Sequence, residues 1–170
     1  MLLELVLSLI FLTIAVGALM SVFTSSMISL RDAGISGTAQ TLVERQMEAY
    51  KKLPYSALKL SAVTVPASSD MYRTSPPGTI GTPFTLVTGG TTAAGACSFP
   101  NDAKSECARQ TFSGPDGRIY RVDSYIVATT PPGGRPGLQI TVTVRQLHSG
   151  VPGSVKAETT SAFDPASPPS

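Results

Sequence analysis

The stretch MLLELVLSLIFLTIAVGALMSVFTSSMISL, residues 1–30, decides the fold of this chain. Residues 5–30 contain no Lys, Arg, Asp or Glu, and about 20 mostly apolar residues suffice to cross a bilayer core of roughly 30 Å. Glu4 is the only charged residue in the stretch. A carboxylate inside such a segment is costly unless it is paired, so Glu4 is a candidate functional residue. The alternative is that Glu4 simply lies among the lipid headgroups.

The apolar stretch lacks the pattern of a cleaved signal peptide. No basic residue precedes it, the apolar run is too long, and no A-x-A cleavage site follows it. We therefore expect residues 1–30 to be retained as a transmembrane or filament-core helix.

Residues 31–54 continue this segment as a one-sided helix. Apolar residues recur there at spacings of three and four, which is typical of an amphipathic helix, and Pro54 ends the pattern. A single helix from residue 2 to 53 would have weak points at Gly34 and Gly37, each costing about 1 kcal/mol against alanine. The apolar positions are Ile35, Ala39, Leu42, Val43, Met47, Tyr50 and Leu53.

Residues 55–163 are predicted to form a loop-rich antiparallel β domain. In residues 138–145 apolar side chains alternate strictly with polar ones, which indicates a strand with one buried and one wet face. Further strands are expected at Arg118–Ala128, after the Gly114–Gly117 turn, and at Val155–Phe163, after a Gly150–Gly153 turn.

Such a meander needs an apolar partner, and the helix at residues 35–53 supplies one. Ala62–Val65 and Phe84–Val87 are short strand candidates, and residues 164–170 are expected to be disordered. The predicted fold class is α+β, a long N-terminal helix packed on a small antiparallel sheet.

Two stretches of the sequence resemble one family. The run LLELVLSLIFLTIAVGAL at residues 2–19, and TLVERQMEAYKKLPYSAL at residues 41–58, are similar to type IV pilins and to the pseudopilins of type II secretion. The resemblance implies a leader removed by a prepilin peptidase, N-terminal methylation at or next to Met1, and assembly of the helix into a filament core. It also implies that Glu4 neutralises the N-terminal amine of a neighbouring subunit.

Two departures from the family concern the N-terminal region. The family's glutamate stands one position further from the processed end, and the given sequence shows no leader. Either the sequence starts just inside the mature protein, which we expect, or the register of the glutamate differs from that of the family. Many pilins also have a proline in the membrane half, whereas this chain has none before Pro54. Unwinding on assembly would then occur near Gly17, Gly34 or Gly37.

Cys97 and Cys107 stand in one polar segment, ACSFPNDAKSEC. If the chain is exported, an oxidising compartment favours a disulfide between them. The alternative is a metal site that adds Asp102, Glu106 or His148, although the spacing matches no strong zinc pattern.

No motif for catalysis is present. The chain lacks G-x-S-x-G, H-E-x-x-H, Walker and dinucleotide-binding patterns, and its one histidine, His148, is expected to be solvated at a turn. Asp116 and Asp123 are too sparse for a calcium loop, and Lys104 and Arg109 are expected to neutralise Asp102 and Glu106. A net charge of +2 gives no argument for nucleic acid. We expect no enzyme activity, cofactor or metal.

These observations predict a structural subunit, minor rather than major, of a type IV pilus-like filament. Its partners would be other pilin subunits, the inner-membrane assembly platform and the prepilin peptidase. It would be a single-pass membrane protein before assembly and part of an extracellular or periplasmic filament afterwards. The alternatives are a type II secretion pseudopilin and a membrane-tethered extracytoplasmic binding module.

Overall fold

The computed structural model describes residues 2–67, 85–93, 97, 106–130 and 133–166. Its contacts divide the chain into two compact units, Met1–Gly37 and Thr38–Ser170. The helix α1, Leu2–Lys51, contributes to both of them. The predicted α+β class is confirmed, because the second unit holds an antiparallel sheet of four strands.

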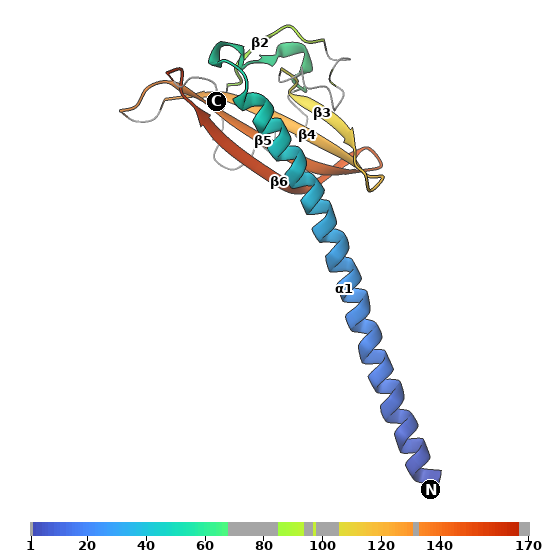
Figure 1. Cartoon of the computed structure of the whole chain (residues 1–170). Helices are drawn as coiled ribbons and strands as arrows, with labels where there is room; N and C mark the ends of the chain where they lie inside the picture. The colour runs from blue at the N-terminus through green and yellow to red at the C-terminus, as the bar shows by residue number, and fades with distance from the viewer. Residues whose placement is uncertain (1, 68–84, 94–96, 98–105, 131–132, 167–170) are drawn as a thin grey trace. The chain divides into compact units, whose positions relative to one another are not determined.

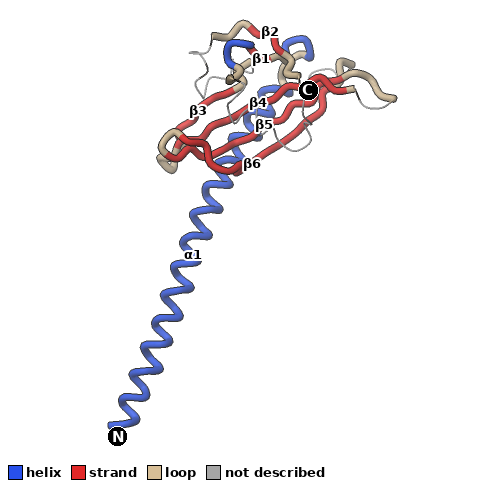
Figure 2. The backbone as a smooth tube through the Cα atoms, turned by 180° about the vertical axis from the view of Figure 1, so that it is seen from behind, coloured by secondary structure: helices blue, strands red, loops and turns tan. Residues whose placement is uncertain are grey.

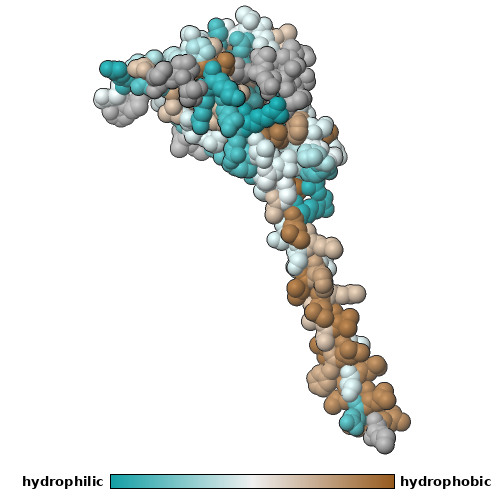
Figure 3. All heavy atoms as spheres, in the orientation of Figure 1, coloured by the Kyte–Doolittle hydropathy of each residue, from teal (hydrophilic) through white to brown (hydrophobic). Residues whose placement is uncertain are grey.

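The first unit is one apolar helical segment (Figure 1). Its large apolar side chains from Leu2 to Leu30 are between 47% and 83% exposed, and Figure 3 shows them as a nearly continuous apolar surface. Within the described part of the chain, α1 is the one helix long and apolar enough to cross a membrane. It runs without a break through Gly17, Gly34 and Gly37.

The later part of α1 has the predicted one-sided character. Its apolar positions are buried and Leu53 is half-buried. The last turn closes as the Lys52 N–H donates to the Glu48 carbonyl oxygen at 3.2 Å, and Pro54, which has no N–H, cannot continue the helix. The buried positions are Ile35, Ala39, Leu42, Val43, Gln46, Met47 and Tyr50.

The four-stranded sheet is a meander in the order β3-β4-β5-β6 (Figure 2). The expected strands at 138–145 and 155–163 are confirmed with longer bounds, and the strand at 118–128 is confirmed one residue later, while the first strand, β3, was not predicted. The strands are β3 Arg109–Ser113, β4 Ile119–Thr129, β5 Gly137–His148 and β6 Val151–Phe163.

Tight turns set the register of this meander. Between β3 and β4 the predicted turn is confirmed: the Gly114 N–H donates to the Arg118 carbonyl oxygen at 2.7 Å. Between β5 and β6, Ser149 and Gly150 have φ of 50° and 81°, the left-handed pair that tight hairpins prefer. This turn comes earlier than predicted, so β6 already begins at Val151.

The segments before the meander differ from the prediction. Ala62–Thr64 forms a 3₁₀ turn and no strand; the preceding pair Leu60–Ser61 is strand β1, parallel to β2, Thr88–Gly90. The prediction of a strand at Phe84–Val87 is also wrong for its described residues, 85–87, since Leu86 makes an isolated bridge to Val127 and no strand is formed there. Phe84 lies outside the described residues. A second 3₁₀ turn is formed by Tyr55–Ala57.

One face of the sheet packs on α1, and we call it the helix face. In the β4–β5 register Val122 lies opposite Val144 and Ile126 opposite Ile140, and all four are fully buried. The Tyr50 hydroxyl of α1 contacts Ser124, which lies on the same face. The helix face comprises Tyr120, Val122, Ser124 and Ile126 of β4 and Ile140, Val142, Val144 and Gln146 of β5.

The opposite face, predicted to be wet, is buried as well. Thr141 and Thr143 are 1% and 0% exposed, and Arg145 is 7% exposed. The alternation predicted the two faces correctly but the solvation of the second face wrongly. We call this second face the arginine face; it comprises Arg109, Arg121, Asp123, Tyr125, Thr141, Thr143 and Arg145.

Candidate functional site

Glu4 lies in the first turn of α1. It is exposed, its backbone carbonyl oxygen accepts a hydrogen bond from the Ser8 hydroxyl at 2.9 Å, and its carboxylate makes no ion pair or hydrogen bond with the described residues. Met1, the other predicted assembly residue, lies outside the described residues. A carboxylate in an apolar helix therefore remains available for a charge outside this chain.

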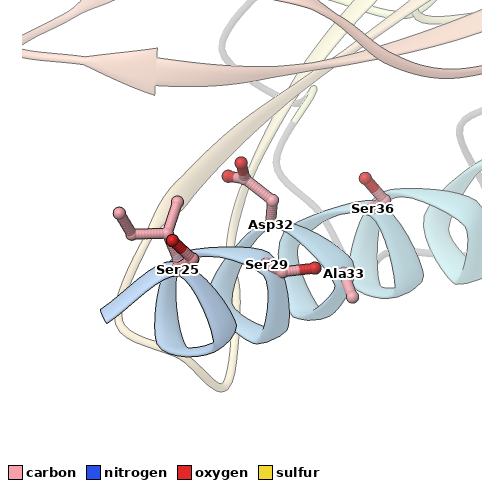
Figure 4. A pocket seen from close by; sticks show the side chains of 6 residues that line it. Ser25, Ser29, Asp32, Ala33 and Ser36 are labelled. Atoms are coloured by element: carbon pink, nitrogen blue, oxygen red, sulfur yellow. The ribbon is translucent and has the colours of Figure 1, made fainter. Parts of the chain in front are cut away.

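A shallow hollow runs beside α1 within the first unit (Figure 4). All of its lining residues come from one helix, and the polar ones are serines and one aspartate without a base, a cation or a second acid among them. It offers no chemistry beyond a polar stripe. The lining residues are Ser25, Ile28, Ser29, Asp32, Ala33 and Ser36.

The predicted disulfide is present. Cys97 and Cys107 are joined, with their Cα atoms 5.7 Å apart. Cys107 is fully buried and precedes β3 by two residues. The metal alternative is wrong for these thiols, because both sulfur atoms are in the disulfide.

Glu106, next to Cys107, has a structural role that the sequence did not indicate. Its Oε2 accepts hydrogen bonds from the Thr91 N–H at 2.7 Å, and from the Thr92 N–H and hydroxyl at 2.9 Å each. Burial raises the pKa of Glu106, but these hydrogen bonds outweigh it and the pKa is lowered. Arg109 forms an ion pair with Asp123. Asp102 and Lys104, the other charged residues of the predicted self-neutralising cluster, lie outside the described residues.

Asp116 also bonds within the chain. Its Oδ2 accepts from the Tyr120 hydroxyl at 2.8 Å and from Arg118 Nη1 at 3.2 Å. Burial raises the pKa of Asp116, but the hydrogen bond from Tyr120 and the contacts with Arg118 outweigh this effect, so that the pKa is lowered from its usual value. The carboxylate fixes the β3–β4 hairpin.

Asp123 lies at the centre of the arginine face and is fully buried. Its Oδ1 accepts from Arg109 Nε at 3.1 Å, and its Oδ2 accepts from Arg121 Nε at 2.8 Å. The nearby Tyr125 is fully buried, and burial, together with the negative charge of Asp123, raises the pKa of its hydroxyl. Tyr125 is therefore neutral, and the buried charges described on this face are those of Arg121, Arg145 and Asp123.

Sequence reasoning missed this charged cluster. A signal was present: Arg121 and Asp123 stand two apart in a predicted strand, so their side chains project from the same face. Which partners face them depends on strand β3 and on the β4–β5 register, neither of which the sequence pattern fixes.

No group of three or more potential metal ligands occurs among the described residues. The exposed His148 at the end of β5 belongs to no cluster in this part of the chain. No protein-family model, curated protein or solved structure matches the chain. A function must therefore be argued from the apolar helix and from the domain that follows it.

Proposed function

We propose that this chain is a minor subunit of a type IV pilus-like filament, assembled through residues 2–30 of α1. The observation that carries the proposal is a long, exposed apolar helix with one early carboxylate, continuous with a helix that packs on an antiparallel sheet. In this role the protein acts by association with neighbouring subunits and carries out no catalytic step.

The apolar side chains of the first unit need a surrounding that keeps them out of water. In this proposal lipid covers them before assembly, and the helices of other subunits cover them afterwards. Glu4 then meets the N-terminal amine of a neighbour in a low-dielectric surrounding, where a paired charge is far cheaper than a lone one. The disulfide supports an oxidising location for the second unit, outside the cytoplasm.

Further partners follow from the same proposal. A prepilin peptidase would expose an N-terminus at Met1 or one residue before it, and an inner-membrane platform would add the subunit to the filament. Mass spectrometry of the protein from its native host should find that N-terminus methylated. A mature N-terminus beyond residue 25 would contradict the proposal.

The decisive experiment compares wild type and Glu4→Ala for co-purification with sheared filaments at equal membrane abundance. Glu4→Ala should be depleted from the filaments, because the amine of the neighbour is left unpaired, which typically costs about 3–5 kcal/mol. The matched control is Glu44→Ala, the same change at an exposed position further along α1, and it should be recovered like wild type.

The alternatives give different results in the same experiment. A type II secretion pseudopilin would show the same dependence on Glu4 in the pseudopilus of a secretion machine. A membrane-tethered binding module would remain in the membrane fraction with neither form enriched in filaments. Equal recovery of wild type and Glu4→Ala in filaments would remove the pairing role of Glu4.

A further inference from the structure

The arginine face carries more buried positive charge than negative charge. Arg121 and Arg145 are 5% and 7% exposed and lie directly opposite each other in the β4–β5 register. Like charges in that position repel each other across the strands. Asp123 is the one described carboxylate that pairs with this face, and it is shared by Arg109 and Arg121. Among the described residues, the buried guanidinium groups of Arg121 and Arg145 therefore face one buried carboxylate, that of Asp123.

Among the described residues, Arg145 makes one hydrogen bond. Its Nη1 donates to the Gly153 carbonyl oxygen at 3.3 Å, and no ion pair with a described carboxylate is formed. Glu158 lies on the neighbouring strand opposite Thr143, yet it is exposed and forms no ion pair with Arg145 within the described residues. A buried guanidinium without an anion is a costly arrangement.

Buried polar atoms of Arg121, Thr143 and Arg145 on this face make no hydrogen bond with the described part of the chain. They are Arg121 Nη2, Arg145 Nε and Thr143 Oγ1. Arg121 Nη2 forms an ion-pair contact with Asp123 Oδ2 at 2.7 Å without hydrogen-bond geometry, whereas the Nε of the same guanidinium donates a hydrogen bond to that oxygen. All three atoms can donate a hydrogen bond. Since they share one face of two paired strands, they form a set of donors that lacks an acceptor.

We propose that Arg121, Thr143 and Arg145 form an oxyanion-binding site, which takes a phosphate or a carboxylate group. Guanidinium groups match both anions in geometry and charge, and the threonine hydroxyl adds a third donor. The ladder between β5 and β6 is interrupted on both sides of Arg145 by register shifts. Such bulges disrupt the ladder locally and re-aim side chains, and they are over-represented next to functional sites.

The test uses the full chain in a non-ionic detergent. Thermal unfolding is followed by the near-ultraviolet circular dichroism of the buried tyrosines, in chloride, acetate or inorganic phosphate at equal pH and ionic strength. Phosphate or acetate should raise the Tm of wild type in a saturable way, because a ligand that binds only the folded state stabilises it. A larger effect of phosphate assigns the site to phosphate groups, and a larger effect of acetate assigns it to carboxylates.

Variants separate the site from a general salt effect. Arg145→Met should lower the affinity for the anion at least tenfold and abolish the Tm shift. Thr143→Val, which keeps every charge, should weaken the shift and carries the test if Arg145→Met does not fold. Arg135→Met removes an exposed arginine outside the site and should keep the full shift. An equal shift in wild type and in the site variants, or no shift in wild type, would overturn the proposal.

Discussion

The two faces of the four-stranded sheet are buried by different chemistry. On the helix face, Val122, Ile126, Ile140 and Val144 are fully buried beneath α1 residues 38–51. On the arginine face, Asp123 is equally buried, but it is surrounded by guanidinium groups. The first face is stabilised by removing apolar area from water, and the second depends on how completely charges are paired.

This difference determines how each face responds to change. On the apolar face, the free energy of unfolding falls roughly in proportion to the buried atoms that a substitution removes, so a conservative substitution lowers it only modestly. A buried ion pair fails abruptly, because removal of one partner leaves the other charge buried without compensation. The following predictions test that contrast, from the largest expected effect to the smallest.

The largest effect is expected for Asp123→Asn. The amide keeps the shape of the carboxylate but removes the negative charge that pairs with Arg109 and Arg121. The free energy of unfolding should fall by about 3–5 kcal/mol, measured by chemical unfolding of the full chain in detergent. The matched control is Asp164→Asn, at an exposed position, which should change stability by no more than about 0.5 kcal/mol. Equal effects of the two substitutions would contradict the pairing at Asp123.

Reduction of the disulfide should have the second largest effect. Cys107 stands two residues before Arg109, so the bond fixes the entry into β3 and thereby one arginine of the arginine face. Opening this short loop should cost about 2–3 kcal/mol in the chain-entropy model. Unfolding is compared with and without a phosphine reductant, and a Cys97→Ala/Cys107→Ala double variant should not respond to the reductant. A response of the double variant would assign the effect to something other than this bond.

A smaller effect is expected for Ile140→Val on the helix face. Ile140 is fully buried, and removal of one methylene group should lower the free energy of unfolding by about 0.5–1.5 kcal/mol. The measurement is the same chemical unfolding as for Asp123→Asn. If Ile140→Val proved as damaging as Asp123→Asn, the distinction between the two faces would not hold.

Local sequence patterns were enough to predict the helix and most of the sheet. The apolar run and the three-and-four spacing in α1 depend only on neighbouring residues, and alternation is equally local in β4 and β5. Strand β3, Arg109–Ser113, was missed because it is short and mostly polar. The predicted disorder at 164–170 is only partly addressed: Asp164 accepts from the Ala166 N–H at 2.8 Å, and residues 167–170 lie outside the described part.

The contacts between distant residues could not be predicted in the same way. Alternation assigned Thr141, Thr143 and Arg145 to solvent, whereas they lie on a buried face, since burial depends on what the rest of the chain places over a sheet. The placement of Arg145 opposite Arg121 follows from strand register. The disulfide was predictable because its two cysteines are close in sequence and such a pair is expected to be oxidised if the chain is exported. The acceptor role of Glu106, by contrast, depends on a loop fourteen residues earlier in the chain.

The smallest effect concerns Glu106, which belongs to neither face and serves as a reference for an ion near solvent. Burial raises its pKa, but the hydrogen bonds from Thr92 and Thr91 outweigh this and hold the pKa below its usual value. A carboxyl group with a lowered folded-state pKa stabilises the fold above its unfolded-state pKa, about 4.3, and this contribution is lost as the pH falls through the lower folded-state value. The Tm of wild type should therefore exceed that of Glu106→Gln at pH 7, and the gap should narrow as the pH is lowered below about 4. The pKa of Asp116 is lowered as well, but Asp116 is present in both proteins, so its contribution cancels from the difference in Tm. Because the charge of Glu106 lies near solvent, the Tm difference between wild type and Glu106→Gln should be smaller than that between wild type and Ile140→Val. A Tm difference that stays constant from pH 7 to pH 3 would show that the hydrogen bonds do not favour the ionised carboxylate.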